Sequence, residues 1–169
     1  MSKIENLNNN EGVLKLKQMV ENINVCFFCT DIKNNNTDTT TLMTAQNVDE
    51  EGNIWFFSGK DSDRNKAISQ EKEVQLYFSH PGKNSYLIVN SEASIVLDKE
   101  KIKELWNPIL KIWFKDGIDD PNISLLKVAT KSAHYWDSEG GKMVNFIKMI
   151  SSLISGTNNV DTTEGKIKI

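Results

Sequence analysis

The chain has 169 residues, of which 38% are hydrophobic and 25% charged, so length and composition fit one soluble domain with its own core. The formal net charge is −3 with both signs interspersed, which gives neither a basic stripe for nucleic acid nor a polybasic surface for a membrane. No apolar run has the length of a bilayer span and the N-terminus lacks the apolar core of a signal peptide, so we expect a cytoplasmic protein.

The first predicted element is an amphipathic helix over residues 11–23, which we expect to pack on an edge of the core. Its apolar side chains recur at helical spacing: Val13, Leu16, Val20 and Ile23. Residues 25–30 predict a strand. The Asn-rich loop that follows favours positive φ angles and leads, as a long hairpin, into a strand within residues 39–46.

Cys26 and Cys29 lie three positions apart in this first strand. In an extended strand their α-carbons would be about 10 Å apart, at about 3.3 Å per residue. A disulfide requires less than about 7 Å. We therefore expect two buried structural thiols rather than a redox pair.

Further strands are predicted at close spacing, joined by turns rather than by crossover helices. A polar turn at residues 47–52 leads to the strand 53–58, and the later strands cover residues 74–79, 86–90 and 93–97. A doubly wound sheet would need a helix between successive parallel strands. The pattern favours a mainly β (α+β) fold, an antiparallel closed or nearly closed barrel with peripheral helices.

The second half begins with a helix over residues 99–106, capped by Asp98 and interrupted at Pro108 before residues 109–114. We expect its apolar side to comprise Ile102, Leu105, Trp106, Ile109, Ile112 and Trp113. Two strands are then predicted at 123–130 and 133–137, followed by a last helix at 143–154. We assign residues 1–155 to a single domain and residues 156–169 to a polar, mobile tail.

A loop crowded with hydroxyls and cations follows the apolar run 54–57. It contains Ser58, Gly59, Lys60, Ser62, Arg64 and Lys66, and Ser62 begins a short helical pattern that carries Ala67 and Ile68 inward. Backbone N–H groups at a helix start, with flanking cations, suit a phosphate. The alternative is a solvated loop in which Ser62 serves only as a helix cap.

Laid out in this way, the sequence resembles the general-stress-protein branch of the pyridoxamine 5′-phosphate oxidase-like family. The resemblance covers roughly residues 13–155 and is carried by LMTAQNVDEEGNIWFFSGKDS, VQLYFSHPGKNSYLIVNSEASIV, LWNPILKIWFKDGIDDPNISLLKV and AHYWDSEGGKMV. It implies a flavin-binding split β-barrel, assembled as a homodimer with FMN at the subunit interface. FAD, a deazaflavin or haem remain alternative ligands, because fold alone does not fix the ligand.

The resemblance also implies roles for individual residues. Leu42, Met43, Thr44 and Gln46 would lie under the flavin ring, with backbone groups meeting its polar edge, and Trp55 to Phe57 would line the strand beside the ring. Ser58, Gly59, Lys60 and Arg64 would hold the FMN phosphate. Among Trp106, Trp113 and Trp136, which suit either the flavin or the core and dimer interface, we prefer Trp113, together with Phe114, for the flavin edge.

The sequence departs from the family in two places. Asp61 and Asp63 would weaken anion binding unless they point outward, and Lys66 either compensates or is a solvated helix residue. The tail 160–169 has no arginine, which argues against true pyridoxamine phosphate oxidation.

Neither His80 nor His134 forms a metal site or triad by sequence, and we assign no catalytic acid or base. Two functions stay open. One is an FMN-dependent oxidoreductase that uses a nicotinamide or another electron donor and acts on a small molecule. The other is a non-enzymatic flavin-binding stress protein that acts as a store, sensor or scavenger.

Overall fold

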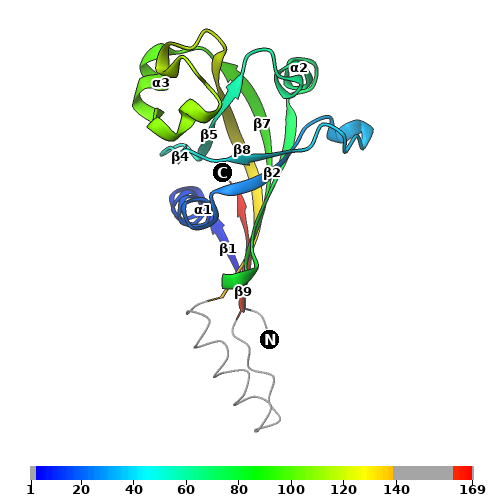
Figure 1. Cartoon of the computed structure of the whole chain (residues 1–169). Helices are drawn as coiled ribbons and strands as arrows, with labels where there is room; N and C mark the ends of the chain where they lie inside the picture. The colour runs from blue at the N-terminus through cyan, green and yellow to red at the C-terminus, as the bar shows by residue number, and fades with distance from the viewer. Residues whose placement is uncertain (1–2, 139–161, 169) are drawn as a thin grey trace.

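Residues 3–138 and 162–168 of a computed structural model are described here, and they form a curled β-sheet with helices packed on it (Figure 1). The strands are β1 (Lys3–Asn8), β2 (Val25–Cys29), β3 (Thr41–Thr44), β4 (Asn47–Val48), β5 (Asn53–Gly59), β6 (Glu73–His80), β7 (Ser85–Val96), β8 (Ile123–Ser138) and β9 (Thr162–Lys168). The α-helices are α1 (Asn9–Ile23), α2 (Asp63–Gln70) and α3 (Lys99–Leu105). Short 3₁₀ turns are η1 (Ile32–Asn34), η2 (Pro81–Lys83), η3 (Pro108–Ile112) and η4 (Gly117–Asp119).

The sheet runs β1-β9-β8-β7-β6-β2-β3, with β5 joined to β8 and β4 joined to β5. The segment 41–48 changes partner along its length, because β3 pairs with β2 and β4 pairs with β5. Two backbone hydrogen bonds mark the change: Ala45 N–H donates to the Asn24 carbonyl and Gln46 N–H to the Trp55 carbonyl, both at 2.8 Å. This change of partner curls the sheet into the expected split barrel. The pairing of β1 with β9 is parallel, whereas the other strand pairs of the described residues are antiparallel.

The long strands β7 and β8 differ from expectation. Each was predicted as two strands, at 86–90 and 93–97 and at 123–130 and 133–137, but each runs without a break. Asn90 pairs with Ser132 and the next residue, Ser91, with Thr130, so Lys131 is the extra residue of a β-bulge. A bulge interrupts the period-2 side-chain pattern while the strand continues.

Two hydrophobic clusters lie on opposite faces of β5, which explains why its sequence is apolar without alternation. Ile54 and Phe56 belong to the larger cluster, inside the barrel with α1. Trp55 and Phe57 belong to the smaller one, under α3 and η3. A strand covered on both faces has no polar side to show.

Helix α1 closes one side of the barrel as its apolar periodicity predicted. Leu16 and Val20 are buried, as is Met19, which the sequence analysis left out. The helix is also held by an ion pair, because Lys15 Nζ lies 2.8 Å from Asp137 Oδ2 near the end of β8. None of the helices in the described part of the chain is long and apolar enough to span a membrane.

The chain after Pro108 does not continue the face of α3. In this segment the buried residues are Leu110, within η3, and Phe114, just after it. Ile109, Ile112 and Trp113, expected on the apolar side, are 62%, 68% and 66% exposed.

The expectation of a mobile C-terminal tail is wrong for residues 162–168. They form β9, which pairs with both β8 and β1, and Ile167 is fully buried. Polar composition hid the strand because only a few of its side chains need to be apolar. The predicted helix at 143–154 lies outside the described residues.

Candidate functional site

Arg64, the only arginine in the chain, is half-buried in the first turn of α2. The helix begins at Ser62, whose hydroxyl accepts a hydrogen bond from Asn65 N–H at 3.2 Å, so the predicted cap is confirmed. From this turn the guanidinium reaches two strands: Nη1 donates to Thr41 Oγ1 at 3.0 Å and Nη2 to Ser58 Oγ at 2.8 Å. Arg64 therefore bridges the start of β3 and the end of β5.

A buried set of hydroxyls and one amide supports this bridge. Ser58 Oγ donates to Asn65 Oδ1 at 2.7 Å, and Asn65 Nδ2 donates to Ser124 Oγ at 3.0 Å. Ser124 Oγ in turn donates to the Ser58 carbonyl at 2.8 Å. At most 2% of each of these three residues is exposed, so the network belongs to the protein interior.

The charge of Arg64 is not neutralised by any described residue. It forms no ion pair there, its Nε is buried without a hydrogen-bond partner, and burial lowers the pKa of its guanidinium. An incoming anion would stabilise such a cation, because it would accept hydrogen bonds from the unused N–H groups and offset the cost of burying the charge. The arrangement fits a phosphate or another small oxyanion.

The structure separates Lys60 from this group. Lys60 is exposed and lines a cavity of about 350 Å³ beside α3, whose lining includes none of Arg64, Ser58 and Thr41. At Gly59, at the end of β5, a Cβ would lie 3.1 Å from Asn122 Nδ2, so a larger residue there would require the Asn122 side chain to shift. Of the four predicted phosphate residues, only Ser58 and Arg64 are in direct contact through their side chains.

The two carboxylates that depart from the family pattern lie at the surface. Asp63 pairs with Lys66, with Oδ1 and Nζ 2.9 Å apart, and its side chain is 92% exposed. Asp61 is also exposed, and its N–H donates to Asn122 Oδ1 at 3.2 Å. Lys66 is thus a solvated helix residue engaged with Asp63.

The predicted ring-binding strand has two distinct faces. Leu42, 66% exposed, and Thr44 point outward, whereas Met43 points into the main core. The Gln46 side chain accepts a hydrogen bond from Asn107 Nδ2 at 3.4 Å, which joins the β3–β4 junction to the start of η3. Side-chain contact with a ligand outside the barrel is thereby limited to the outward residues.

The aromatic candidates separate in the same way. Phe57 is buried against Trp106 and Phe114, at ring-centroid distances of 5.9 and 6.2 Å. Trp136, on the outer face of β8, stacks on His134 at 4.2 Å. Trp113, at the end of η3, is the most exposed of the three tryptophans that the sequence analysis weighed.

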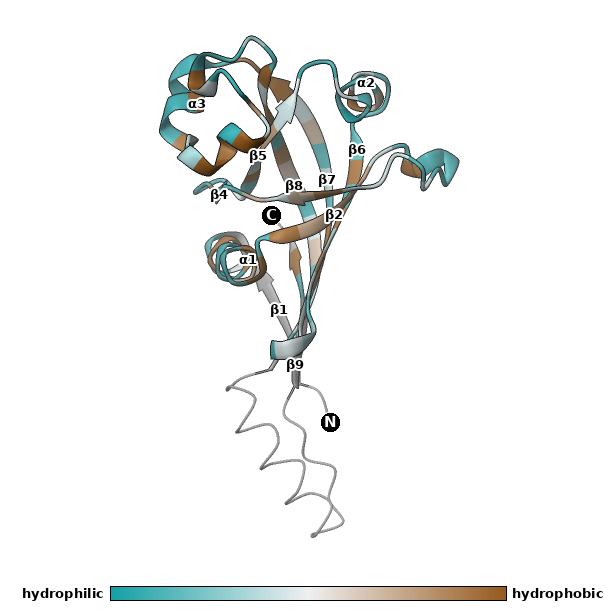
Figure 2. Cartoon of the chain, in the orientation of Figure 1, coloured by the Kyte–Doolittle hydropathy of each residue, from teal (hydrophilic) through white to brown (hydrophobic). Residues whose placement is uncertain are grey.

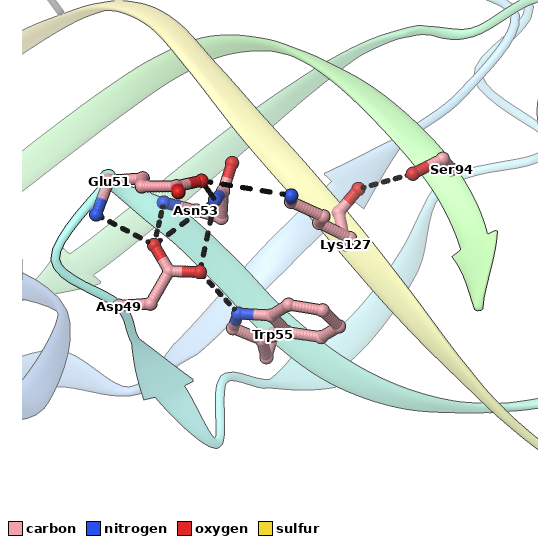
Figure 3. A network of polar contacts seen from close by, with 6 residues as sticks. All are labelled: Asp49, Glu51, Asn53, Trp55, Ser94 and Lys127. Atoms are coloured by element: carbon pink, nitrogen blue, oxygen red, sulfur yellow. Dashed lines mark hydrogen bonds and ion pairs between the residues drawn. The ribbon is translucent and has the colours of Figure 1, made fainter. Parts of the chain in front are cut away.

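A second polar cluster fixes the β4–β5 turn (Figure 3). Asp49 Oδ1 accepts from the backbone N–H groups of Glu51 and Asn53, and its Oδ2 accepts from Trp55 Nε1 at 2.9 Å. Burial tends to raise the pKa of the Asp49 carboxyl, but hydrogen bonds from Asn53, Trp55 and Glu51 outweigh it and lower that pKa. This cluster holds the turn rather than a ligand.

Sequence reasoning missed three members of the Arg64 network: Thr41, Asn65 and Ser124. Thr41 and Asn65 are each adjacent in sequence to a predicted residue, Leu42 and Arg64, so proximity was a weak signal for them. Ser124 is far away in sequence and reaches the site only through the pairing of β5 with β8, in which it lies opposite Ser58.

A family model, pyridoxamine 5′-phosphate oxidase like, matches residues 11–161. The chain belongs to this family. Its neighbours among solved structures include proteins named as general stress proteins, and these share its fold. The resemblance of the sequence to this family is thereby confirmed.

Three relatives illustrate the range of similarity. A general stress protein 26 of Jannaschia sp. CCS1 superimposes with a TM-score of 0.80 over 95% of this chain and 99% of that one, at 18% identity. The general stress FMN/FAD binding protein of Xanthomonas citri gives a TM-score of 0.64 at 25% identity, over 77% and 90% of the two chains. Protein bli-3 of Neurospora crassa is 26% identical over 90 residues, 48% of this chain and 43% of that protein.

Proposed function

We propose that the protein binds FMN and uses it in a flavin-dependent oxidation or reduction of a small molecule. The observation that carries this proposal is Arg64, a half-buried cation with no ion-pair partner among the described residues and a buried Nε without an acceptor. The terminal phosphate of FMN is an anion of the right kind for it. The family and the Xanthomonas citri neighbour, named as an FMN/FAD binding protein, support the flavin.

The surroundings of Arg64 suit the rest of an FMN molecule. Its partner Thr41 is followed at once by Leu42, whose exposed side chain offers an apolar surface for a flat ring. Thr44 lies on the same outward face and Gln46 follows at the partner-switch of the strand. FMN would supply reversible hydride or electron transfer; these residues would bind and orient it.

A second copy of the chain is proposed to cover this outward face. Three large apolar side chains lie in register across β3, β2 and β6: Leu42 opposite Phe27, and Phe27 opposite Tyr77, with exposed fractions of 66%, 50% and 38%. Figure 2 shows β2 hydrophobic along most of its length, in contrast to the hydrophilic loop after it. An exposed apolar row in register marks a protein interface, and a homodimer would bury the row and the ring together.

A non-enzymatic flavin-binding protein is the second candidate. In the described part of the chain, the side chains joined to Arg64 and to its partners are hydroxyls and one amide: Thr41, Ser58, Ser62, Asn65 and Ser124. These groups bind an anion but do not exchange a proton with a substrate near neutral pH. This favours storage, sensing or scavenging.

The experiment that tests the flavin proposal is an absorbance spectrum of the purified protein, followed by denaturation and identification of the released molecule. We expect oxidised-flavin bands and FMN. Arg64→Met should weaken FMN binding by roughly tenfold or more, since a charge-assisted contact contributes about 1.5–3 kcal/mol. A colourless protein that takes up no added FMN would refute the proposal.

The choice between the two candidates is made by turnover. Bound flavin that NADH or NADPH reduces anaerobically, and that an acceptor then reoxidises repeatedly, would establish the oxidoreductase. Flavin that stays oxidised with every donor tried would establish the binding protein.

A further inference from the structure

The Ser58 hydroxyl, 2% exposed, is in contact with three side chains at the end of β5. It lies 2.7 Å from Asn65 Oδ1, 2.8 Å from Arg64 Nη2 and 3.3 Å from Ser62 Oγ. A hydroxyl has one proton to donate and two lone pairs to accept with. Which contact takes the proton decides what Ser58 has left to offer a ligand.

A backbone carbonyl settles that question. The Ser58 carbonyl can only accept a hydrogen bond, so the hydroxyl of Ser124, whose Oγ lies 2.8 Å away, donates its one proton to that carbonyl. Ser124 can then only accept from Asn65, so the amide must turn Nδ2 toward Ser124 and Oδ1 toward Ser58. Asn65 Oδ1 has no proton, and Ser58 is therefore the donor to it.

The same assignment of donors and acceptors determines the orientation of the Arg64 guanidinium. With its proton used on Asn65, Ser58 Oγ accepts from Arg64 Nη2, and Thr41 Oγ1 accepts from Arg64 Nη1. Anchors on both terminal nitrogens set the plane of the guanidinium. Of its five N–H groups, the one on Nε and one on each terminal nitrogen are not used by these two contacts.

We propose that Ser58 and Asn65 are positioning residues, which orient Arg64 toward the phosphate of the bound ligand, and that the Ser58 hydroxyl does not itself bind that phosphate. The inference rests on the proposed flavin function, and it assigns to Ser58 a role different from the direct phosphate contact that the family resemblance implies. A phosphate dianion only accepts hydrogen bonds, and Ser58 has no proton left to give it.

A double-mutant cycle tests this inference. FMN and riboflavin differ by the phosphate, so the ratio of their affinities isolates the phosphate contribution. Ser58→Ala should lower the affinity for FMN by roughly tenfold and leave that for riboflavin unchanged, because a misaligned guanidinium loses one good contact. Arg64→Met should remove the phosphate contribution, and Ser58→Ala should add nothing further in the Arg64→Met background.

Two results would overturn the inference. If Ser58→Ala lowers FMN affinity by the same factor with and without Arg64, then Ser58 binds the phosphate directly. If Ser58→Ala alone leaves the FMN affinity unchanged, then Ser58 does not position Arg64. The matched control is Ser91→Ala, which removes another buried hydroxyl, on β7 and outside the Arg64 network, and should leave the ratio unchanged.

A readout without flavin separates failure of the inference from failure of the proposed function. Arg64 is the only arginine, so the guanidinium signals in a ¹⁵N-labelled sample belong to it alone. Anchored terminal nitrogens rotate slowly and give separate signals, which should merge in Ser58→Ala and in Asn65→Ala. Signals equally resolved in both variants would refute the positioning role, whereas absent binding of FMN and riboflavin by the wild type would refute the flavin proposal instead.

Discussion

The Asp49 carboxylate holds the β4–β5 turn through hydrogen bonds from two backbone N–H groups and two side chains. We predict that Asp49→Asn lowers the free energy of unfolding at pH 7 by roughly 1–3 kcal/mol, because an amide presents one acceptor where the carboxylate presents two. Urea unfolding measures the loss. The control is Asp61→Asn, an exposed carboxylate in the next loop, which should change stability little.

The pH dependence of this stabilisation has a definite sign. Since the folded-state pKa of Asp49 is lowered, its contribution is complete above the unfolded value of about 3.9 and is lost as pH falls through the folded value. The stability difference between wild type and Asp49→Asn should therefore shrink below about pH 4. A difference that stays constant down to pH 2 would contradict the assignment.

The two cysteines should react differently. Cys26 is buried, and burial, followed by the nearby Cys29, raises its pKa far above that of an ordinary thiol. Cys29 is half-buried rather than fully buried as expected, and both thiols are free. A thiol-specific disulfide reagent at pH 8 should modify Cys29 first. Cys29→Ser should abolish the fast phase and Cys26→Ser should preserve it.

Among the elements, β9 gives the sharpest test of the fold. Ile167 is fully buried opposite Ala133 of β8, so Ile167→Ala should cost about 2–5 kcal/mol of unfolding free energy. Lys166→Ala, one residue earlier and exposed, should cost little. If both changes had negligible effects in urea unfolding, the result would contradict the packing of β9 and support the expectation of a mobile tail.

Elements whose signals are local were predictable from the sequence. Helix α1 has a helical apolar period, α2 begins at a Ser cap, and α3 begins at Asp98, whose carboxylate accepts from Glu100 and Lys101 N–H. Elements decided by distant pairing were not. The bulge at Lys131 and the strand β9 depend on β8 as a partner, and the burial of η3 depends on how the chain settles over β5.

The candidate site divides along the same line. Arg64 was predictable, because a cation beside a helix start suggests an anion site in any sequence. Its supports were not: Ser124 is close to Ser58 only because β5 pairs with β8. Met43 and Phe57 lie within the predicted ring-binding stretch, but both side chains are buried: strand alternation turns Met43 into the barrel, and α3 and η3 cover the face of β5 that carries Phe57. A sequence pattern gives the neighbourhood of a site more readily than the orientation of each side chain.

At the scale of the whole molecule, the apolar row of Leu42, Phe27 and Tyr77 predicts a dimer. Phe27→Lys should shift the protein to monomers in light scattering, because it places a charge within the proposed interface. FMN affinity should fall with it if the flavin lies between subunits. Leu14→Lys is the matched control, since Leu14 is 68% exposed on α1, away from the row. A wild type that is monomeric and still binds flavin tightly would refute the interface site.

Strand β8 is the common partner of β5, β7 and β9, and it lies late in the chain (Figure 1). During synthesis on the ribosome, β5 and β7 therefore leave the exit tunnel with unpaired edges and wait for residues 123–138. Until these emerge, the barrel has no means of closing, and apolar strands such as β5 stay open to association with other nascent chains. The order in which the chain is made thus delays closure of the barrel until β8 is translated, and chaperone dependence should be greatest just before that point.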